Sequence, residues 1–145
     1  MHNKVVAALI GIVVAAGLMY FGYSYNPSLK NISFQSSQSV GTVSMLIDNG
    51  REITGYKNLT IPADASVFGL LQNVTASNNI TLDFDPASSN SFNSVFIKQI
   101  DGRVNGEFGS FWQYWVDGEQ PQVGADKYVL KGGETVLWTF RPSEL

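Results

Sequence analysis

The start of the predicted domain shows the alternation of hydrophobic and polar positions that is typical of paired strands. Residues Thr42 to Asp48 alternate in part and are rich in β-branched side chains. They are followed by Asn49-Gly50, a dipeptide that favours a tight hairpin turn. A second strand is predicted from about Glu52 to Ile61, where Pro62 closes it. The pattern therefore predicts a β-hairpin.

After the hairpin, the hydrophobic period becomes that of a helix. Four apolar residues fall at positions i, i+3, i+4 and i+7 and so share one helical face: Val67, Leu70, Leu71 and Val74. Asp64 precedes them at a position where an N-cap is expected. We therefore expect a short amphipathic helix over about Ala65 to Val74.

Short apolar segments between turn residues follow the helix. We expect strands at Ile80 to Phe84, Val95 to Ile100, Trp112 to Val116, Lys127 to Leu130 and Glu134 to Phe140. This order predicts an α+β fold of the β-grasp type, with one helix packed on a mixed or antiparallel sheet of about five strands. The expected core consists of Val43, Met45, Ile47, Val67, Leu70, Leu71, Phe96, Ile97, Ile100, Trp115, Val136 and Trp138.

The N-terminal segment has no polar face at all. Residues Val5 to Tyr23 form an uncharged apolar run of 19 residues, close to the roughly 20 that a membrane-spanning helix needs. Lys4 on the short flank favours a cytoplasmic N-terminus, which would place the rest of the chain outside the cytoplasm. A cleaved signal peptide is the alternative, because small residues lie near Tyr23. We expect an anchor or signal segment at 1–24, a linker at 25–41 and a domain at 42–145.

Four Asn-x-Ser/Thr triplets agree with an extracytoplasmic location. The candidate glycosylation acceptors are Asn31, Asn58, Asn73 and Asn79. Chance also produces such triplets in a chain rich in Asn, Ser and Thr. We therefore expect a cell-surface glycoprotein only where the cell has the machinery for this modification.

Composition excludes several classes of function. Only 14% of residues are charged and the formal net charge is −3, which argues against a nucleic-acid binder. The chain has no cysteine, and His2 is its single histidine. The predicted domain therefore cannot form a Ser-His or Cys-His nucleophile, a thiolate redox centre or a zinc site made of His or Cys. We expect a protein that is not an enzyme and has no cofactor.

Three blocks in the second half resemble a known family. They are Ile100 to Gly102, FWQYWVDG at Phe111 to Gly118 and VGADKYVLKGGETVLWTF at Val123 to Phe140. With the helix entry at Ile61 to Val67, they resemble the transcobalamin C-terminal-like domain of unknown function, over about residues 43–142. Family members usually have Asn at the position of Asp117, a change that keeps the turn chemistry.

The resemblance implies the fold of the β-domain of vertebrate cobalamin carriers. In those carriers the corrinoid is held between this domain and a large helical barrel, and these 145 residues contain no barrel. Corrinoid binding is therefore expected only together with a separate partner, and no contact residue is carried over.

Aromatic residues make the strand at Trp112 to Val116 the main candidate for recognition. Side chains alternate along a strand, so Trp112 and Tyr114 share one face and Trp115 lies on the other. Trp112, Tyr114 and Tyr128 are the candidate ligand-binding residues, forming a shallow platform for a planar ligand, a glycan or a protein. Alternatively, this set packs on the sheet or under the loop after Gly118.

Two acidic pairs and a glycine-rich loop are weaker candidates. Asp83 and Asp85 share a strand face but lack the remaining ligands of a calcium loop. Asp117 and Glu119 could form an acid/base pair for glycoside chemistry, but they flank a turn, where such residues are common. Residues Gly102 to Gly109 lack phosphate-binding spacing and indicate a flexible recognition loop. No metal or catalytic residue is predicted.

Together these observations predict a membrane-anchored extracytoplasmic binding module that recognises a ligand or a protein partner. Its site would be the aromatic strand and the adjoining loops. The first alternative is a structural subunit of a cell-surface assembly or filament, with contacts between copies of the chain. The second is corrinoid (cobalamin) binding with a separate partner, which depends on the family resemblance alone.

Overall fold

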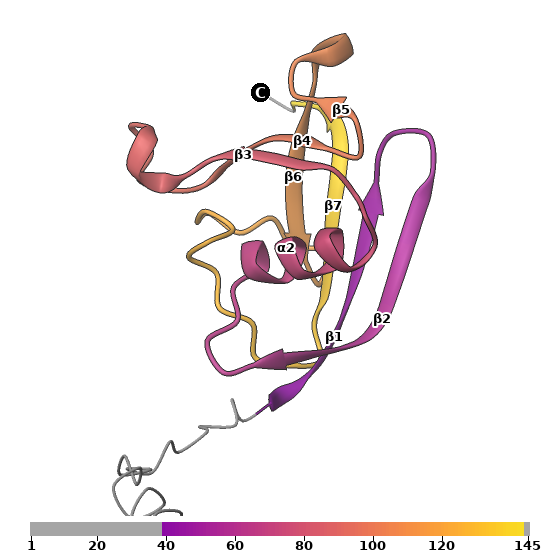
Figure 1. The fold of residues 1–145 in the computed structure, drawn as a ribbon, viewed down its shortest axis with the longest axis vertical. Coiled ribbons are helices and arrows are strands. Elements are labelled where there is room, and N and C mark those ends of the chain that lie inside the picture. Colours follow the sequence, from indigo (N-terminus) through magenta and orange to yellow (C-terminus); the bar gives the residue numbers. More distant parts are fainter. Residues whose placement is uncertain (1–38, 144–145) are drawn as a thin grey trace, which may run out of the picture. The chain divides into compact units, whose positions relative to one another are not determined.

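The computed structural model describes residues 39–143. The predicted anchor at 5–23 and the candidate acceptor Asn31 lie outside these residues. The elements are β1 (Ser39–Asp48), β2 (Ile53–Pro62), α2 (Val67–Ser77), β3 (Leu82–Asp85), η1 (Ala87–Ser89), β4 (Phe96–Ile100), β5 (Arg103–Val104), η2 (Glu107–Gly109), β6 (Ser110–Val116) and β7 (Thr135–Pro142), where η marks a 3-10 turn (Figure 1). No helix within 39–143 has both the length and the apolar character needed to cross a membrane.

Two sheets and one helix form the described part of the chain. The larger sheet has the order β2-β1-β7-β6, in which β1 and β7 are parallel and the outer pairs are antiparallel. The smaller sheet has the order β3-β4-β5. In Figure 1, α2, β3 and β4 pass in front of β6 and β7. The predicted α+β class is confirmed. The single sheet of about five strands is wrong, because β3, β4 and β5 pair with each other and pack over the helix side.

The predicted hairpin is present and its loop spans residues 49–52. Asp48 pairs with Ile53, and the Asn49 side-chain oxygen accepts hydrogen bonds from the backbone N–H groups of Arg51 and Glu52, both at 3.0 Å. Gly50 has a φ of 79°, a left-handed conformation that glycine adopts without steric strain. Asn49 and Gly50 thus make the turn that the sequence predicts.

The helix begins later than predicted and has a different cap. Ser66 is the N-cap of α2, and its Oγ accepts a hydrogen bond from Gly69 N at 3.0 Å. The prediction of Asp64 as the cap is wrong, because Asp64 has a φ of 63° and lies in the turn before the helix. At the other end, the side-chain amide of Asn78 donates to Val74 O at 2.8 Å.

The loop at residues 124–130, which precedes β7, covers the start of α2. The first two N–H groups of the helix, those of Val67 and Phe68, donate to Tyr128 O at 3.1 Å and Ala125 O at 2.9 Å. Helix-initial N–H groups have no partner within the helix, so this loop satisfies them. The predicted strand at Lys127 to Leu130 is wrong. Its backbone bonds to the helix entry, with a single bridge between Ser66 and Val129.

The core lies between the larger sheet on one side and α2 with the smaller sheet on the other. Ten of the twelve residues predicted for it are buried. Phe96 is 43% exposed, and Trp115 is only half-buried on the opposite face of the sheet. The buried apolar residues that the prediction did not include are Ile61, Phe68, Val74, Trp112, Tyr114, Val116, Ala125, Leu130 and Phe140.

The cap of α2 makes a stability prediction. Ser66→Ala removes the acceptor for Gly69 N, so the free energy of unfolding of the full chain should fall by about 1 kcal/mol. Ser77→Ala is the matched control, because the Ser77 hydroxyl bonds only to the exposed Asn73 side chain. Urea denaturation followed by circular dichroism measures both variants. Equal losses in the two would contradict the assignment of Ser66 as the cap.

Candidate functional site

Strand β6 alternates as predicted, but its two faces have the opposite roles. Trp112 is 7% exposed and Tyr114 is 9% exposed, and both point into the core. Trp115 lies on the other face with Gln113. The expectation that Trp112 and Tyr114 form an exposed platform is therefore wrong. Apolar residues lie on both sides of β6, so alternation alone did not decide which face is covered.

The buried aromatic residues of β6 are fixed by hydrogen bonds at their polar ends. Trp112 Nε1 donates to Arg103 O at 2.9 Å, and its ring centroid lies 5.3 Å from that of Phe140. The Tyr114 hydroxyl donates to Val123 O at 2.6 Å, and its ring lies 5.4 Å from Trp138. Trp112 therefore ties β5 to the larger sheet, and Tyr114 ties the loop at Val123 to it, while both side chains fill the core.

Tyr114 and Tyr128 are close to each other, as predicted, but beneath the surface. Burial raises the pKa of the Tyr114 hydroxyl to about 12, and the nearby Tyr128 and Asp126 add to the shift. Tyr128 is half-buried against the core. Of the three predicted residues, none is exposed enough to form an open platform.

The uncovered surface is the opposite side of the larger sheet, here called the open face: the side that carries Leu46, Trp115, Leu137 and Arg141. No helix among residues 39–143 covers it. Leu46 pairs with Leu137, and Leu137 pairs with Trp115, so the three side chains form a row across β1, β7 and β6. Gly55 is opposite Leu46, and a Cβ there would lie 3.2 Å from Leu46 Cδ2. Because Gly55 has no side chain, the Leu46 side chain lies next to bare backbone of β2 at the end of this row.

A hollow of about 590 Å³ lies on the open face, beside the turn that follows β6. Leu46 and Leu137 line its apolar part, and Trp115 forms an aromatic wall. The guanidinium carbon of Arg141 lies 3.8 Å from the centroid of the Trp115 ring, within the range of a cation–π contact. Asp117, Gly118 and Thr135 complete the lining. The hollow thus combines an apolar floor with a few polar groups, the composition typical of small-ligand sites.

The sequence contained part of the signal for this hollow. Once Val136 and Trp138 are placed in the core, alternation puts Leu137 on the opposite face. The same argument applies to Leu46, between the core residues Met45 and Ile47. The parallel pairing of β1 with β7 brings the two leucines together, and no local pattern reveals that pairing.

The acidic pair on β3 is neutralised by a lysine. Lys98 Nζ lies 3.1 Å from an Asp83 carboxylate oxygen and 3.4 Å from one of Asp85. The bond to Asp83, followed by the bond to Asp85, raises the pKa of Lys98. Both carboxylates therefore have a cationic partner. Within residues 39–143 no three His, Cys, Asp or Glu side chains are grouped to hold a metal ion.

The second acidic pair and the glycine-rich loop have structural contacts. Asp117 Oδ1 accepts a hydrogen bond from Thr135 N at 2.8 Å and so joins the turn after β6 to the start of β7. Glu119 N donates to Val116 O at 3.0 Å. Arg103, in β5, forms an ion pair of 3.6 Å with Glu107 in the loop that follows. The contacts of Asp117 and Glu119 fix the turn beside the hollow.

Comparison with protein families assigns most of this region to one family. The model of the domain of unknown function DUF4430 matches residues 64–141. This range includes α2, β6, most of β7 and Trp115, which forms the wall of the hollow. The chain belongs to the DUF4430 family. No curated protein matches the sequence.

Solved structures show that the DUF4430 chain shares its fold with two other proteins. A candidate metal-binding protein from Ruminococcus gnavus ATCC 29149 has a TM-score of 0.52 at 18% identity, over 71% of this chain and 98% of that one. Haptocorrin in complex with Cbi has a TM-score of 0.55 at 19% identity, over 70% of this chain. The chain spans 25% of haptocorrin. At these identities the likeness shows a transcobalamin-like fold alone.

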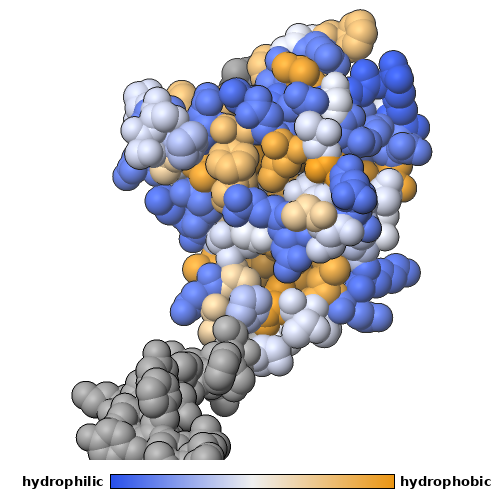
Figure 2. Space-filling model, in the orientation of Figure 1, coloured by the Kyte–Doolittle hydropathy of each residue, from blue (hydrophilic) through white to orange (hydrophobic). Residues whose placement is uncertain are grey.

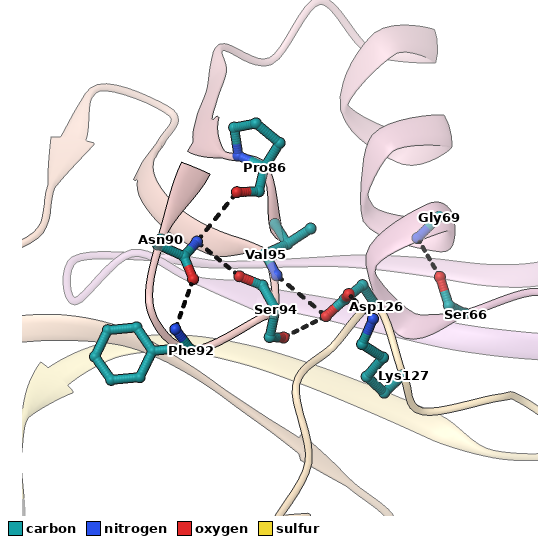
Figure 3. A network of polar contacts seen from close by, with 9 residues as sticks. All are labelled: Ser66, Gly69, Pro86, Asn90, Phe92, Ser94, Val95, Asp126 and Lys127. Atoms are coloured by element: carbon teal, nitrogen blue, oxygen red, sulfur yellow. Dashed lines mark hydrogen bonds and ion pairs between the residues drawn. The ribbon is translucent and has the colours of Figure 1, made fainter. Parts of the chain in front are cut away.

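The Gly124-Ala125-Asp126 segment of the DUF4430 domain joins two loops. One Asp126 oxygen accepts hydrogen bonds from the Ser94 hydroxyl and from Val95 N, and Lys127 pairs with the other oxygen at 3.1 Å (Figure 3). Burial opposes ionisation of Asp126, but the bonds from Ser94 and Lys127 outweigh it and lower the pKa of the carboxyl group. A Cβ at Gly124 would lie 1.6 Å from Ser94 Oγ, so glycine is required. This part of the family pattern is therefore structural.

Tyr114 makes a prediction for the DUF4430 domain. Burial raises its pKa from the ordinary 10.0 of a tyrosine to about 12, so the folded chain keeps the proton to higher pH than the unfolded chain. Stability from this residue should be complete below pH 10 and decrease as the pH rises toward 12. Absorbance titration of the tyrosines should lose its highest-pH step in Tyr114→Phe. That variant should also lose about 1 kcal/mol at neutral pH, with the bond to Val123. An unchanged titration would contradict the assignment.

Proposed function

We propose that this DUF4430 chain is a non-enzymatic binding module and that the hollow on the open face is its ligand site. The observation that carries the proposal is the row of Leu46, Leu137 and Trp115, which lies on a sheet face that no helix of residues 39–143 covers. These three side chains are half-buried around the hollow, and apolar side chains that line a concave surface are typical of ligand sites. The site is on the aromatic strand and the turn after it, although on the opposite face from the predicted platform.

The lining of the hollow favours binding over catalysis. Its charged groups are Asp117 and Arg141, and each already has a structural contact: Asp117 with Thr135 N, and Arg141 with the Trp115 ring. The chain has no cysteine and its single histidine is His2. An apolar floor with two polar edges can hold a planar or apolar ligand group in one orientation.

The proposal includes a location outside the cytoplasm, with the membrane contact made by residues 5–23. Three sequence features support it: the uncharged run of 19 residues, the Asn-x-Ser/Thr triplets and a charged fraction of only 14%. Secretion is the outcome if the N-terminal segment is cleaved. The finer assignment of the domain to the β-grasp type is part of the same proposal.

Corrinoid binding is included as a candidate ligand class because of the shared fold. Haptocorrin was solved in complex with Cbi, and this chain corresponds to a quarter of it. A partner would have to supply the remaining contacts. Cyanocobalamin is therefore one of the probes in the test of the hollow.

Binding at the hollow should change the environment of one tryptophan among three. The full chain, labelled with ¹⁵N in detergent, is titrated with cyanocobalamin, a chitin trimer and 2-naphthol. We expect at least one probe to shift the Trp115 indole signal in a saturable way and to leave those of Trp112 and Trp138 in place, because these two are buried on the other face. The Trp115 signal is identified by its absence in Trp115→Phe.

Trp115 and Phe111 lie on the same face of β6 and provide a test variant and its matched control. Trp115→Ala should weaken the binding of that probe at least about tenfold, since it removes a wall of the hollow. Phe111→Ala should leave the affinity unchanged, because Phe111 is 40% exposed and does not line the hollow. Saturable binding that leaves Trp115 unshifted would place the site elsewhere.

A structural role in a surface assembly is the second candidate, and a different observation favours it. Phe108 is 89% exposed and has a φ of 52°, an uncommon conformation for a bulky residue. The loop that presents it is closed by Gly106 N donating to Ser110 O at 2.8 Å and by the Arg103–Glu107 ion pair. Because the loop is already closed by these contacts, little backbone entropy is lost when it binds a partner, so the exposed Phe108 ring is suited to contacts between copies.

This second candidate predicts self-association that depends on Phe108. Sedimentation velocity of the full chain in detergent should show concentration-dependent association, which Phe108→Ser should weaken at least about tenfold. Phe92→Ser is the control, since Phe92 is 77% exposed in a different loop. A wild-type chain that stays monomeric at all concentrations, or equal effects of the two variants, would rule out the Phe108 contact.

A further inference from the structure

The described residues contain three of the four Asn-x-Ser/Thr triplets, and each has a different local structure. Asn58 lies in β2, Asn73 lies within α2, and Asn79 follows the helix. A glycosyltransferase must reach both the asparagine amide and the hydroxyl of the third residue. The three sites can therefore be ranked by the access that the fold leaves to these two groups.

Asn58 is displaced from its strand. Val43 pairs with Leu59 and Met45 pairs with Tyr56, so Lys57 and Asn58 together oppose Ser44 and form a β-bulge. Asn58 has a φ of 56°. β2 is the outermost strand of its sheet (Figure 1), and the side chains of Asn58 and Thr60 are exposed. The bulge thus presents Asn58 away from the regular strand pairing, while Thr60 pairs with Thr42 on the exposed edge strand.

Asn79 is also in an exposed turn. It follows Asn78, the C-cap of α2, and has a φ of 55°. Asn79 and Thr81 are both exposed. The backbone contacts around them are Ile80 N to Thr75 O at 2.9 Å and Asp101 N to Thr81 O at 2.8 Å, and neither uses the two required side-chain groups.

Asn73 has an exposed side chain, but the rest of its triplet is closed. Thr75 is 2% exposed. Its hydroxyl donates to Leu71 O at 2.8 Å and lies 3.1 Å from Gln72 O, within the same helix. A transferase that reads this hydroxyl would have to unfold the last turns of α2, and Val74 beside it belongs to the core.

We infer that Asn58 and Asn79 are N-glycosylation sites of the folded chain and that Asn73 is not. In the reaction, the asparagine amide nitrogen bonds to the anomeric carbon of a sugar carried by a polyprenyl phosphate. The bond between that carbon and the phosphate oxygen breaks, the polyprenyl phosphate leaves, and the amide proton goes to a base. In the cell the reaction requires the extracytoplasmic location proposed above.

Neither Asn58 nor Asn79 lines the hollow on the open face. Asn58 and Asn73 line a second hollow of about 250 Å³ between β2 and α2, which lies on the helix side of the sheet. On that side, apolar patches are scattered among polar residues (Figure 2). Leu46, Trp115 and Leu137 lie on the opposite side. A glycan at Asn58 would also shield the edge of β2 from pairing with another strand.

The test is independent of the location of the chain in the cell and of ligand binding. The purified, folded full chain is incubated with an oligosaccharyltransferase and its polyprenyl-linked oligosaccharide, and occupancy of each site is measured by peptide mass spectrometry. We expect sugar at Asn58 and Asn79, and a rate at Asn73 at least about tenfold lower, because modification there requires local opening of α2. Thr60→Ala and Thr81→Ala should each abolish only the site to which they belong.

A peptide of residues 70–78 is the control for Asn73, since it is too short to keep a stable helix. The enzyme should modify Asn73 in this peptide. Modification of Asn73 in the folded chain at the rate of the other sites would overturn the inference, as would an unmodified peptide. An empty Asn58 or Asn79 would overturn it for that site.

Discussion

The docking of the Gly124 to Leu130 loop on the start of α2 connects most parts of this fold. The carbonyl groups of Ala125 and Tyr128 accept the first N–H groups of the helix, and Asp126 holds the loop before β4 through Ser94 and Val95. From the sheet side, the hydroxyl of Tyr114 donates to Val123 O and so fixes the residue just before this loop. A helix of 11 residues is marginal by itself, so its position depends on these contacts and on its apolar face.

Local patterns predicted the elements that depend on local chemistry. The hairpin at Asn49-Gly50, the period of α2 and most of the core follow from residues near each other in sequence. The cap was misplaced by two residues, because Asp64 and Ser66 are both good capping residues and the turn geometry decides between them. The Lys127 to Leu130 segment has strand composition, but its partner is the helix entry, which is more than 60 residues away in the sequence.

The candidate site depends on two facts that a sequence pattern does not contain. One is the face of β6 that meets the helix, since Trp112 and Trp115 are equally suited to burial. The other is the parallel pairing of β1 with β7, which brings Leu46 beside Leu137. Long-range pairings of this kind carry no local signature. The recognition surface that we propose therefore lies on the opposite side of the aromatic strand from the platform that the sequence predicted.

The position of β1 in the sheet has a mechanical consequence. The described part of the chain begins with this strand, which is bonded on one side to β2 and on the other to β7. Tension applied through the preceding residues would act along β1 and load both ladders of hydrogen bonds at once. Such ladders resist extension because many bonds must break together. If the proposed anchor holds the domain by its N-terminal end, a force applied through a ligand bound on β1, β6 and β7 would be resisted by both ladders. The binding surface could then keep its shape under tension.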